Sequence, residues 1–159
     1  MIRVGTGFDI HRLSPGRRLV LCGAEFDSPL GLLGHSDADA PVHALVDALL
    51  GAAALGDIGT LFPDTDPALA GADSMEMLRE TVRLLRSRGW RPANADVTVF
   101  AETPKISPRA PEMRENLASA LGIGAGAVSV KGKTMEKLGP VGAGQAIAAQ
   151  AAVLVESCN

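Results

Sequence analysis

The chain has 159 residues, of which 47% are apolar and only 3% aromatic, with a formal net charge of -3 at pH 7. This length predicts a single domain spanning residues 1–159, with a core built from aliphatic side chains. The acidic balance and the scarcity of aromatic rings argue against a nucleic-acid partner. No apolar run reaches 18 residues and no secretory signal pattern is present, so we expect a cytoplasmic protein with no membrane contact.

The first two expected elements are strands. Residues 2–10 and 18–23 are rich in Val, Leu and Ile, and residues 14–16 between them are Ser-Pro-Gly, which is typical of a turn. Cys22 lies in the second strand and Cys158 near the end of the chain, too far apart in sequence to suggest a disulfide framework or a cysteine metal site.

A helix is expected from about Ser36, with Asp37 or Asp39 as its N-cap, Pro41 in its first turn and Gly56 near its end. Its apolar stripe consists of Val42, Leu45, Val46, Leu49, Leu50 and Ala53. Residues 56–72 then show no helix or strand period in their apolar residues and contain many Gly, Pro and Asp residues. A loop of this length is usually a binding loop or a lid, although a flexible linker remains an alternative.

The second half alternates helices and strands. A helix begins at Asp73 or Ser74, where Glu76 could complete a capping box, and ends at Gly89. The other expected elements are a strand over 95–101, a loop over 103–108, a helix over 111–121, a strand over 128–134 and a segment over 146–156 that is ambiguous between helix and strand. This order predicts an α+β sandwich in which helices cover one face of a mixed sheet.

A carboxylate and two imidazoles are the best candidates for a metal site. Asp9 and His11 are two residues apart in an extended segment, so they share one face of a strand. His43 lies in the first turns of the expected helix and could supply a third ligand. Three N/N/O donors suit zinc and leave a fourth position open for a substrate atom. Asp-x-His alone is also common in strands that bind no metal, so the pair by itself is weak evidence.

Six ordered motifs cover nearly the whole chain. They are Gly5-x-Gly7-Phe8-Asp9-x-His11, Gly34-His35-Ser36-Asp37-Ala38-Asp39, His43-Ala44-x-x-Asp47-Ala48, Gly56-Asp57-Ile58-Gly59-x-x-Phe62-Pro63-Asp64, Pro104-Lys105 and Thr134-x-Glu136-Lys137-Leu138-Gly139. In this combination the chain closely resembles the 2-C-methyl-D-erythritol 2,4-cyclodiphosphate synthase family. The resemblance implies a ferredoxin-like α/β sandwich, assembled as a homotrimer with active sites between subunits.

The resemblance also implies roles for individual residues. Zn²⁺ would be held by Asp9, His11 and His43, and Mg²⁺ or Mn²⁺ on the substrate diphosphate by Glu136, with Lys133 and Thr134 beside it. Contacts to the methylerythritol phosphate would come from His35, Ser36, Asp57 and Gly59. Ile58, Phe62 and Asp64 would be further substrate-binding residues. The cytidine pocket would comprise Pro104, Lys105, Ile106 and Gly132.

The implied reaction closes a ring within one cytidyl diphosphate substrate. The substrate's own 2-phosphate attacks the β-phosphorus of the diphosphate and expels CMP. A phosphate oxygen is already a competent nucleophile, so the protein needs no Ser, Cys or His nucleophile, and the sequence arranges none. Metal ions and lysines suffice to position the substrate and neutralise charge.

The chain departs from the family pattern at two places. Met135 stands where a polar residue is common, and residues 142–146 read Gly-Ala-Gly-Gln-Ala where Gly-Arg-Gly-Glu-Gly is frequent. Ala143 and Gln145 therefore replace an Arg and a Glu that lie near the threefold axis in the family.

Two alternative functions stay open at this point, a metal-dependent phosphohydrolase and a trimeric small-molecule binder with a structural metal. Structural zinc normally has four protein ligands, which counts against the binder.

Overall fold

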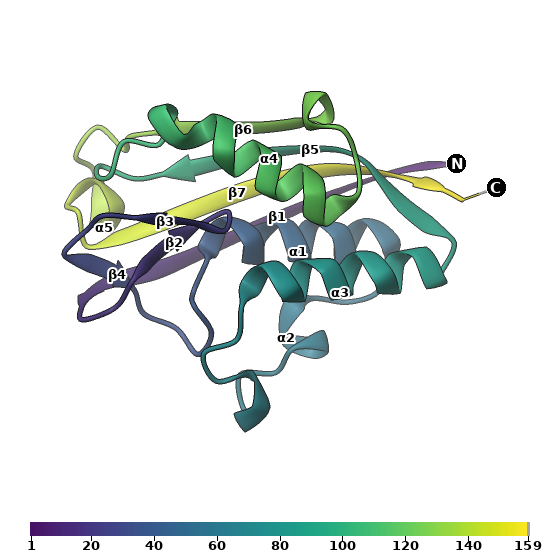
Figure 1. Cartoon of the computed structure of the whole chain (residues 1–159), viewed down its shortest axis with the longest axis horizontal. Helices are drawn as coiled ribbons and strands as arrows, with labels where there is room; N and C mark the ends of the chain where they lie inside the picture. The colour runs from purple at the N-terminus through teal and green to yellow at the C-terminus, as the bar shows by residue number, and fades with distance from the viewer. Residues whose placement is uncertain (159) are drawn as a thin grey trace.

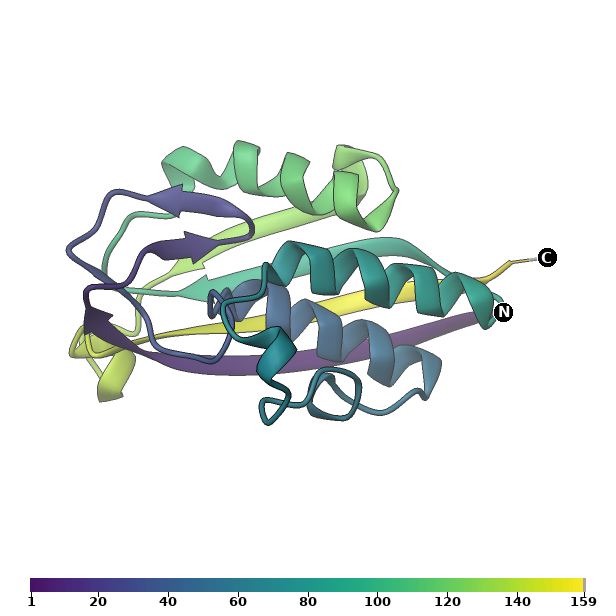
Figure 2. The ribbon, with the colours of Figure 1, turned by 60° about the horizontal axis from the view of Figure 1, so that its bottom comes forward.

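The computed structural model describes residues 1–158 and shows helices packed on one face of a five-stranded mixed sheet (Figures 1 and 2). The sheet order is β4-β1-β7-β5-β6, in which β7 is antiparallel to both β1 and β5, and β5 is parallel to β6. The strands are β1 (Ile2–Pro15), β4 (Leu30–Leu32), β5 (Trp90–Phe100), β6 (Val128–Lys133) and β7 (Ala146–Ser157). A separate hairpin pairs β2 (Leu19–Leu21) with β3 (Ala24–Phe26).

Three long helices form the second layer. They are α1 (Ala40–Ala53), α3 (Ser74–Ser87) and α4 (Ala110–Leu121). The short elements are α2 (Ile58–Leu61), α5 (Gly139–Gly142) and the 3-10 turns Pro67–Leu69, Ser107–Arg109 and Ala125–Ala127. Helix α1 packs on β1 and β7, α4 packs on β6, and α3 lies against both helices. Within residues 1–158, no helix is long and apolar enough to cross a membrane.

This arrangement confirms the predicted α+β sandwich with helices on one face of a mixed sheet. The long elements follow the order β1, α1, α3, β5, α4, β6, β7, which departs from the β-α-β-β-α-β order of the ferredoxin-like motif. The two layers, a sheet covered by helices on one face, are nevertheless those of the ferredoxin-like motif. The ambiguous segment over 146–156 is a strand because it pairs with β1 on one side and β5 on the other.

Two glycines bring α1 unusually close to β1. A Cβ added at Gly5 would overlap the backbone oxygen of Ala48, and one at Gly7 would overlap that of Ala44. Only glycine at both positions allows this approach. The close packing places the N-terminal half of α1, which carries His43, directly over the strand that carries Asp9.

Several predicted boundaries moved. Helix α1 starts at Ala40, not near Ser36. Its N-cap is Asp39, one of the two predicted caps, which accepts a hydrogen bond from Val42 N. It ends at Ala53, before Gly56, with Ala54 in the left-handed conformation. The strand predicted over 18–23 covers only 19–21, because Cys22 and Gly23 form the tight turn of the hairpin with positive φ.

The prediction for the next helix holds in part. Asp73 caps α3, but Glu76 forms ion pairs with Arg79 and Arg83. The region over 56–72, expected to lack structure, contains α2 and one 3-10 turn.

Candidate metal centre and its cleft

Three possible metal-ligand atoms, two from β1 and one from α1, lie close together. Asp9 Oδ2 lies 2.9 Å from His11 Nε2 and 3.0 Å from His43 Nδ1. The two ring nitrogens lie 3.3 Å from each other. Alternation along β1 brings the first two side chains to the helix face, and α1 supplies the third. The predicted cluster is therefore assembled in space, and its atoms could hold a metal ion.

The second nitrogen of each ring has a partner outside the cluster. His11 Nδ1 donates to the backbone oxygen of Leu33 at 2.8 Å, which leaves its Nε2 without a proton when the ring is neutral. His43 Nε2 lies within hydrogen-bond distance of the hydroxyls of Ser36 and Ser74. Outer partners of this kind orient imidazole ligands in metal sites.

The electrostatics of the cluster favour a cation. Burial raises the pKa of the Asp9 carboxyl, but the bonds to His11 and His43 outweigh it and hold that pKa well below its usual value. The bond to Asp9 raises the pKa of His11. The cluster therefore stabilises positive charge at the place that a metal ion would take.

The donor geometry fits zinc. Tetrahedral ligands at about 2.0–2.1 Å from zinc lie roughly 3.3–3.4 Å apart. The observed separations of 2.9–3.3 Å approach this spacing without a large movement. Three protein donors leave one position open, as in catalytic sites, whereas structural sites use four.

The metal cluster opens into a cleft of about 430 Å³ that is lined by β1, α1, the loops on either side of α1, and α3. Of the predicted substrate-binding residues between 35 and 64, all but one lie around it: His35, Ser36, Ile58, Gly59, Phe62 and Asp64. Asp57 is the exception, because it caps α2 through bonds from Thr60 N and Oγ1, which lower its pKa. Asp47 accepts a bond from Ile58 N and so fixes α2 beside the cleft.

Three residues of this cleft were not predicted from the sequence: Gly34, Leu69 and Met77. Gly34 belonged to a quoted motif, and its role is steric, because a Cβ there would lie 2.8 Å from the Cβ of Ala38 and 3.1 Å from Cε1 of His11. Leu69 and Met77 carry no chemical signal. They enter the cleft only because the chain folds back over α1.

The remaining predicted site residues lie elsewhere. Ile106 is buried against Gly132, where a Cβ would come within 2.7 Å of the Ile106 Cβ. Beside them are Pro104, which follows a cis peptide bond, and the exposed Lys105. Lys133, Thr134 and Glu136 continue from the end of β6 and are also exposed.

The strand register shows that this second group is distant from the metal cluster. Asp9 pairs with Ala149, Ala149 with Val99, and Val99 with Gly132. Three strand spacings separate Asp9 from Gly132, or about 14–15 Å. Ala149 and Val99 are fully buried between them. The core therefore blocks a direct path between the two groups on the helix face.

The loop that carries Glu136 is held by a second carboxylate. Glu102 Oε1 accepts hydrogen bonds from Met135 N at 3.1 Å and Lys137 N at 3.5 Å. Thr134 Oγ1 donates to Glu136 Oε1 at 2.8 Å. Glu136 and Lys137 both have positive φ, a conformation that non-glycine residues rarely adopt. The loop thus presents Glu136 to solvent in a defined geometry.

Comparison with known proteins settles the family, because the model of the YgbB family matches residues 2–156. This chain belongs to the YgbB family. Curated relatives named 2-C-methyl-D-erythritol 2,4-cyclodiphosphate synthase include one from Dechloromonas aromatica, 58% identical over 97% of this chain and 96% of its own length. Another, from Symbiobacterium thermophilum, is 57% identical over 96% of this chain and 97% of its own.

Solved structures agree with the fold. The structure of the bifunctional IspDF from Campylobacter jejuni gives a TM-score of 0.95 with 39% identity and covers 99% of this chain, which spans only 42% of that longer protein. A CDP complex of IspF from Plasmodium falciparum gives a TM-score of 0.87 with 37% identity, covering 99% of this chain and 97% of that one.

Proposed function

We propose that this YgbB-family chain converts 4-diphosphocytidyl-2-C-methyl-D-erythritol 2-phosphate to 2-C-methyl-D-erythritol 2,4-cyclodiphosphate and CMP, a step of non-mevalonate isoprenoid biosynthesis. One observation carries the proposal: the cluster of Asp9, His11 and His43 opens into a cleft, in a chain 58% identical to a synthase of that name. The three donor atoms could hold a cation, and the cleft leaves room for a phosphate beside it.

The chemistry requires positioning more than reactive side chains. An oxygen of the substrate 2-phosphate forms a bond to the β-phosphorus, the bond from that phosphorus to the bridging oxygen breaks, and the electron pair leaves with CMP. A zinc ion at the cluster would act as a Lewis acid on a phosphate oxygen. His35 and Ser36 line the same cleft and can orient the phosphorylated end.

Glu136 is proposed to hold Mg²⁺ or Mn²⁺ on the substrate diphosphate, with Lys133 and Thr134 beside it. The support is that the 134–137 loop is fixed by Glu102 and presents an exposed carboxylate. Carboxylate oxygens are suitable ligands for these hard cations, which usually also bind substrate phosphates.

The nucleotide end is proposed to bind at Pro104, Lys105, Ile106 and Gly132. These residues form one group at the end of the parallel β5–β6 pair. A CDP complex of a relative with 37% identity supports a cytidine nucleotide as the ligand class. Lys105 is exposed and could neutralise the diphosphate.

A homotrimer is proposed to bring the two groups together. Within one chain, buried core separates the metal cluster from the nucleotide group, so a substrate that touches both needs a second subunit. The open face of the sheet offers an interface, because Val4, Phe8 and Ile10 of β1 are 68%, 59% and 44% exposed there. Apolar side chains of this size on one strand face favour burial against another chain.

We further propose that the enzyme works in the cytoplasm, where thiols stay reduced. Cys22 and Cys158 are both free, and Cys158 is exposed.

A single assay with the cytidyl diphosphate substrate tests the function. Ring closure predicts CMP release with no matching release of free phosphate, together with a cyclic diphosphate detectable by phosphorus NMR. Free phosphate released alongside CMP would instead indicate a phosphohydrolase. Binding without turnover, in protein loaded with both metals, would indicate a small-molecule binder.

A further inference from the structure

On the side of His43 that faces away from Asp9 and His11, the side chains of Ser74 and Asp37 form a line of hydrogen bonds. Ser74 Oγ lies 2.9 Å from His43 Nε2 and donates to Asp37 Oδ1. The direction follows from the acceptor, because an ionised carboxylate has no proton to give. Ser74 therefore uses its only proton on Asp37 and accepts the proton of His43 Nε2.

This direction fixes the tautomer of His43. In the neutral ring, a proton on Nε2 leaves Nδ1 available to a metal ion, beside Asp9 Oδ2 at 3.0 Å and His11 Nε2 at 3.3 Å. The opposite tautomer would place a proton on Nδ1, where a metal ion has to bind. The line of bonds thus holds the ring in the state that a metal site requires.

The two outer residues are rigidly placed. Ser74 is fully buried as the first residue of α3, and its backbone N–H also donates to Asp37 Oδ2 at 3.2 Å. Both carboxylate oxygens of Asp37 therefore bind the same serine. Ser36 Oγ, 3.1 Å from His43 Nε2, is a second possible acceptor for the ring proton.

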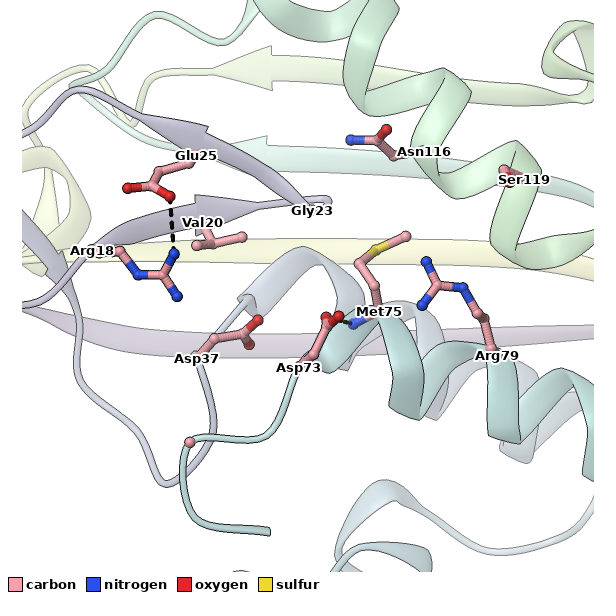
Figure 3. A pocket seen from close by; sticks show the side chains of 11 residues that line it. Arg18, Val20, Gly23, Glu25, Asp37, Asp73, Met75, Arg79, Asn116 and Ser119 are labelled. Carbon is pink, nitrogen blue, oxygen red and sulfur yellow. Dashed lines mark hydrogen bonds and ion pairs between the residues drawn. The ribbon is translucent and has the colours of Figure 1, made fainter.

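Asp37 does not lie at the cleft of the metal cluster. It lines a separate polar cavity of about 410 Å³ between the β2–β3 hairpin, α3 and α4. Figure 3 shows Asp37 on the loop before α1 and Asp73 at the start of α3, both at this cavity. Asp37 can therefore reach the metal centre through Ser74 without touching a substrate in the cleft.

We propose that Ser74 and Asp37 are positioning residues that set the tautomer and orientation of His43, and through them the affinity of the metal centre. This inference rests on the metal centre of the proposed function, but not on the reaction. A purely structural role is the alternative, because the same bonds tie α3 to the loop before α1. That role would change stability and leave metal affinity unchanged in the folded protein.

The test is the dissociation constant of Zn²⁺ or Co²⁺, measured by competition with a chelator in the absence of substrate. Ser74→Ala removes the acceptor. Asp37→Asn leaves one acceptor oxygen for the two bonds from Ser74 and the bond from Asp39 N. Each should raise the dissociation constant roughly 10-fold, at the lower end of the 10–100-fold range typical of outer ligands, because Ser36 remains. Asp73→Asn is the matched control, since Asp73 lines the same cavity but its side chain accepts a hydrogen bond from Met75 N and not from Ser74. Its dissociation constant should lie within about twofold of the wild-type value, well below the 10–100-fold effect of outer ligands.

The double variant decides how Asp37 acts. If it works through Ser74, adding Asp37→Asn to Ser74→Ala should cause no further loss of metal affinity. The inference would be overturned if the losses of metal affinity from the two substitutions added up in the double variant. It would also be overturned if either folded single variant bound metal as tightly as wild type. NMR of nitrogen-labelled histidine in the zinc-loaded wild type should show a proton on His43 Nε2, and a proton on Nδ1 would also overturn it. Because no step uses the substrate, failure of the proposed reaction would leave this result unaffected.

Discussion

Asp39 joins the β2–β3 hairpin to the N-terminus of α1, because its Oδ2 accepts a 2.7 Å hydrogen bond from the backbone N–H of Gly23. Its Oδ1 accepts from Cys22 N and Val42 N. The side chain is fully buried. Burial raises the pKa of Asp39 to about 7, against the opposing effect of these bonds. The helix that carries His43 is therefore anchored by a carboxyl group that titrates near neutral pH.

The first prediction concerns stability against pH. An unfolded Asp titrates near about 3.9, so folding takes up a proton at Asp39 between about pH 4 and pH 7. The stability that this group contributes is complete below about pH 4 and is lost as the pH rises through about 7. Asp39→Asn lacks this dependence. The free energy of unfolding of wild type, relative to the variant, should fall as the pH rises from about 5 to about 8.

Chemical unfolding of both metal-free proteins across this range provides the measurement. Asp9 has a lowered pKa and loses its contribution as the pH falls, but it is present in both proteins and cancels in the difference. A difference that stays constant with pH would show that Asp39 keeps the same charge in both states.

The second prediction is that His43→Ala removes most of the bound metal and of the activity. The loss of metal affinity should exceed the roughly 10–100-fold effect of outer residues, because a direct donor is deleted. His35→Ala is the matched control: His35 lines the same cleft but donates to Asp66 O, outside the cluster. Elemental analysis should find full metal in the control. Full metal in His43→Ala would refute the assignment.

The third prediction tests the shared active site. His11→Ala and Lys105→Ala should each be inactive, because each removes one of the two groups that the sheet keeps apart. We assume that each site takes one group from each of two neighbouring subunits. When equal amounts of the two variants exchange subunits at random, about a quarter of the interfaces in a ring then combine the two intact groups. Activity should therefore return on mixing. Subunit exchange shown by mass spectrometry with no recovery would place each site within one chain.

The fourth prediction concerns Glu136, whose carboxylate is proposed to bind a metal and not to act as a base. Glu136→Gln should lower activity, and excess Mg²⁺ or Mn²⁺ should partly restore it, because a weakened site still fills at higher concentration. Glu115→Gln, an exposed glutamate on α4, serves as the control and should behave as wild type. A loss that no metal concentration changes would mean another role, including that of a plain exposed residue at a strand end.

The metal cluster was predictable because each of its parts has a local pattern. Alternation in β1 places Asp9 and His11 on one face, and the spacing in α1 places His43 near a helix start. The close approach that joins them depends on Gly5 and Gly7, which the motif contained without showing their steric role.

The remaining features could not be predicted in this way. Ser74 was recognised only as a possible helix cap, because its partner His43 is 31 residues away and no local pattern connects them. The distance between Asp9 and Gly132 follows from the strand order β1-β7-β5-β6, which tertiary packing decides. The choice between the two predicted caps of α1 was also not local, because Asp39 is held in place by Cys22 N and Gly23 N of the hairpin.

The fifth prediction arises from an apolar cavity of about 270 Å³ on the open face of the sheet. All of its lining residues are uncharged: Phe8, Ile10, Phe100, Met135, Leu138, Gly139, Pro140, Val141, Ala148 and Gln150. Beside it, Ala143 and the exposed Gln145 stand where the family often has Arg and Glu. Removing both partners of a charged pair together can be nearly neutral for stability. A trimer should therefore form normally in this chain.

An anion at this cavity would lack charge-assisted hydrogen bonds worth about 1.5–3 kcal/mol each. We therefore expect prenyl diphosphates to bind weakly or not at all, while catalysis is unaffected. Calorimetric titration with geranyl diphosphate measures this directly, and the double variant Ala143→Arg/Gln145→Glu should gain binding because it restores the charged pair. Tight binding to wild type, one per trimer and unchanged by His43→Ala, would mean that other residues supply the positive charge. The apolar lining would then hold the prenyl chain without Ala143 having any influence on the headgroup.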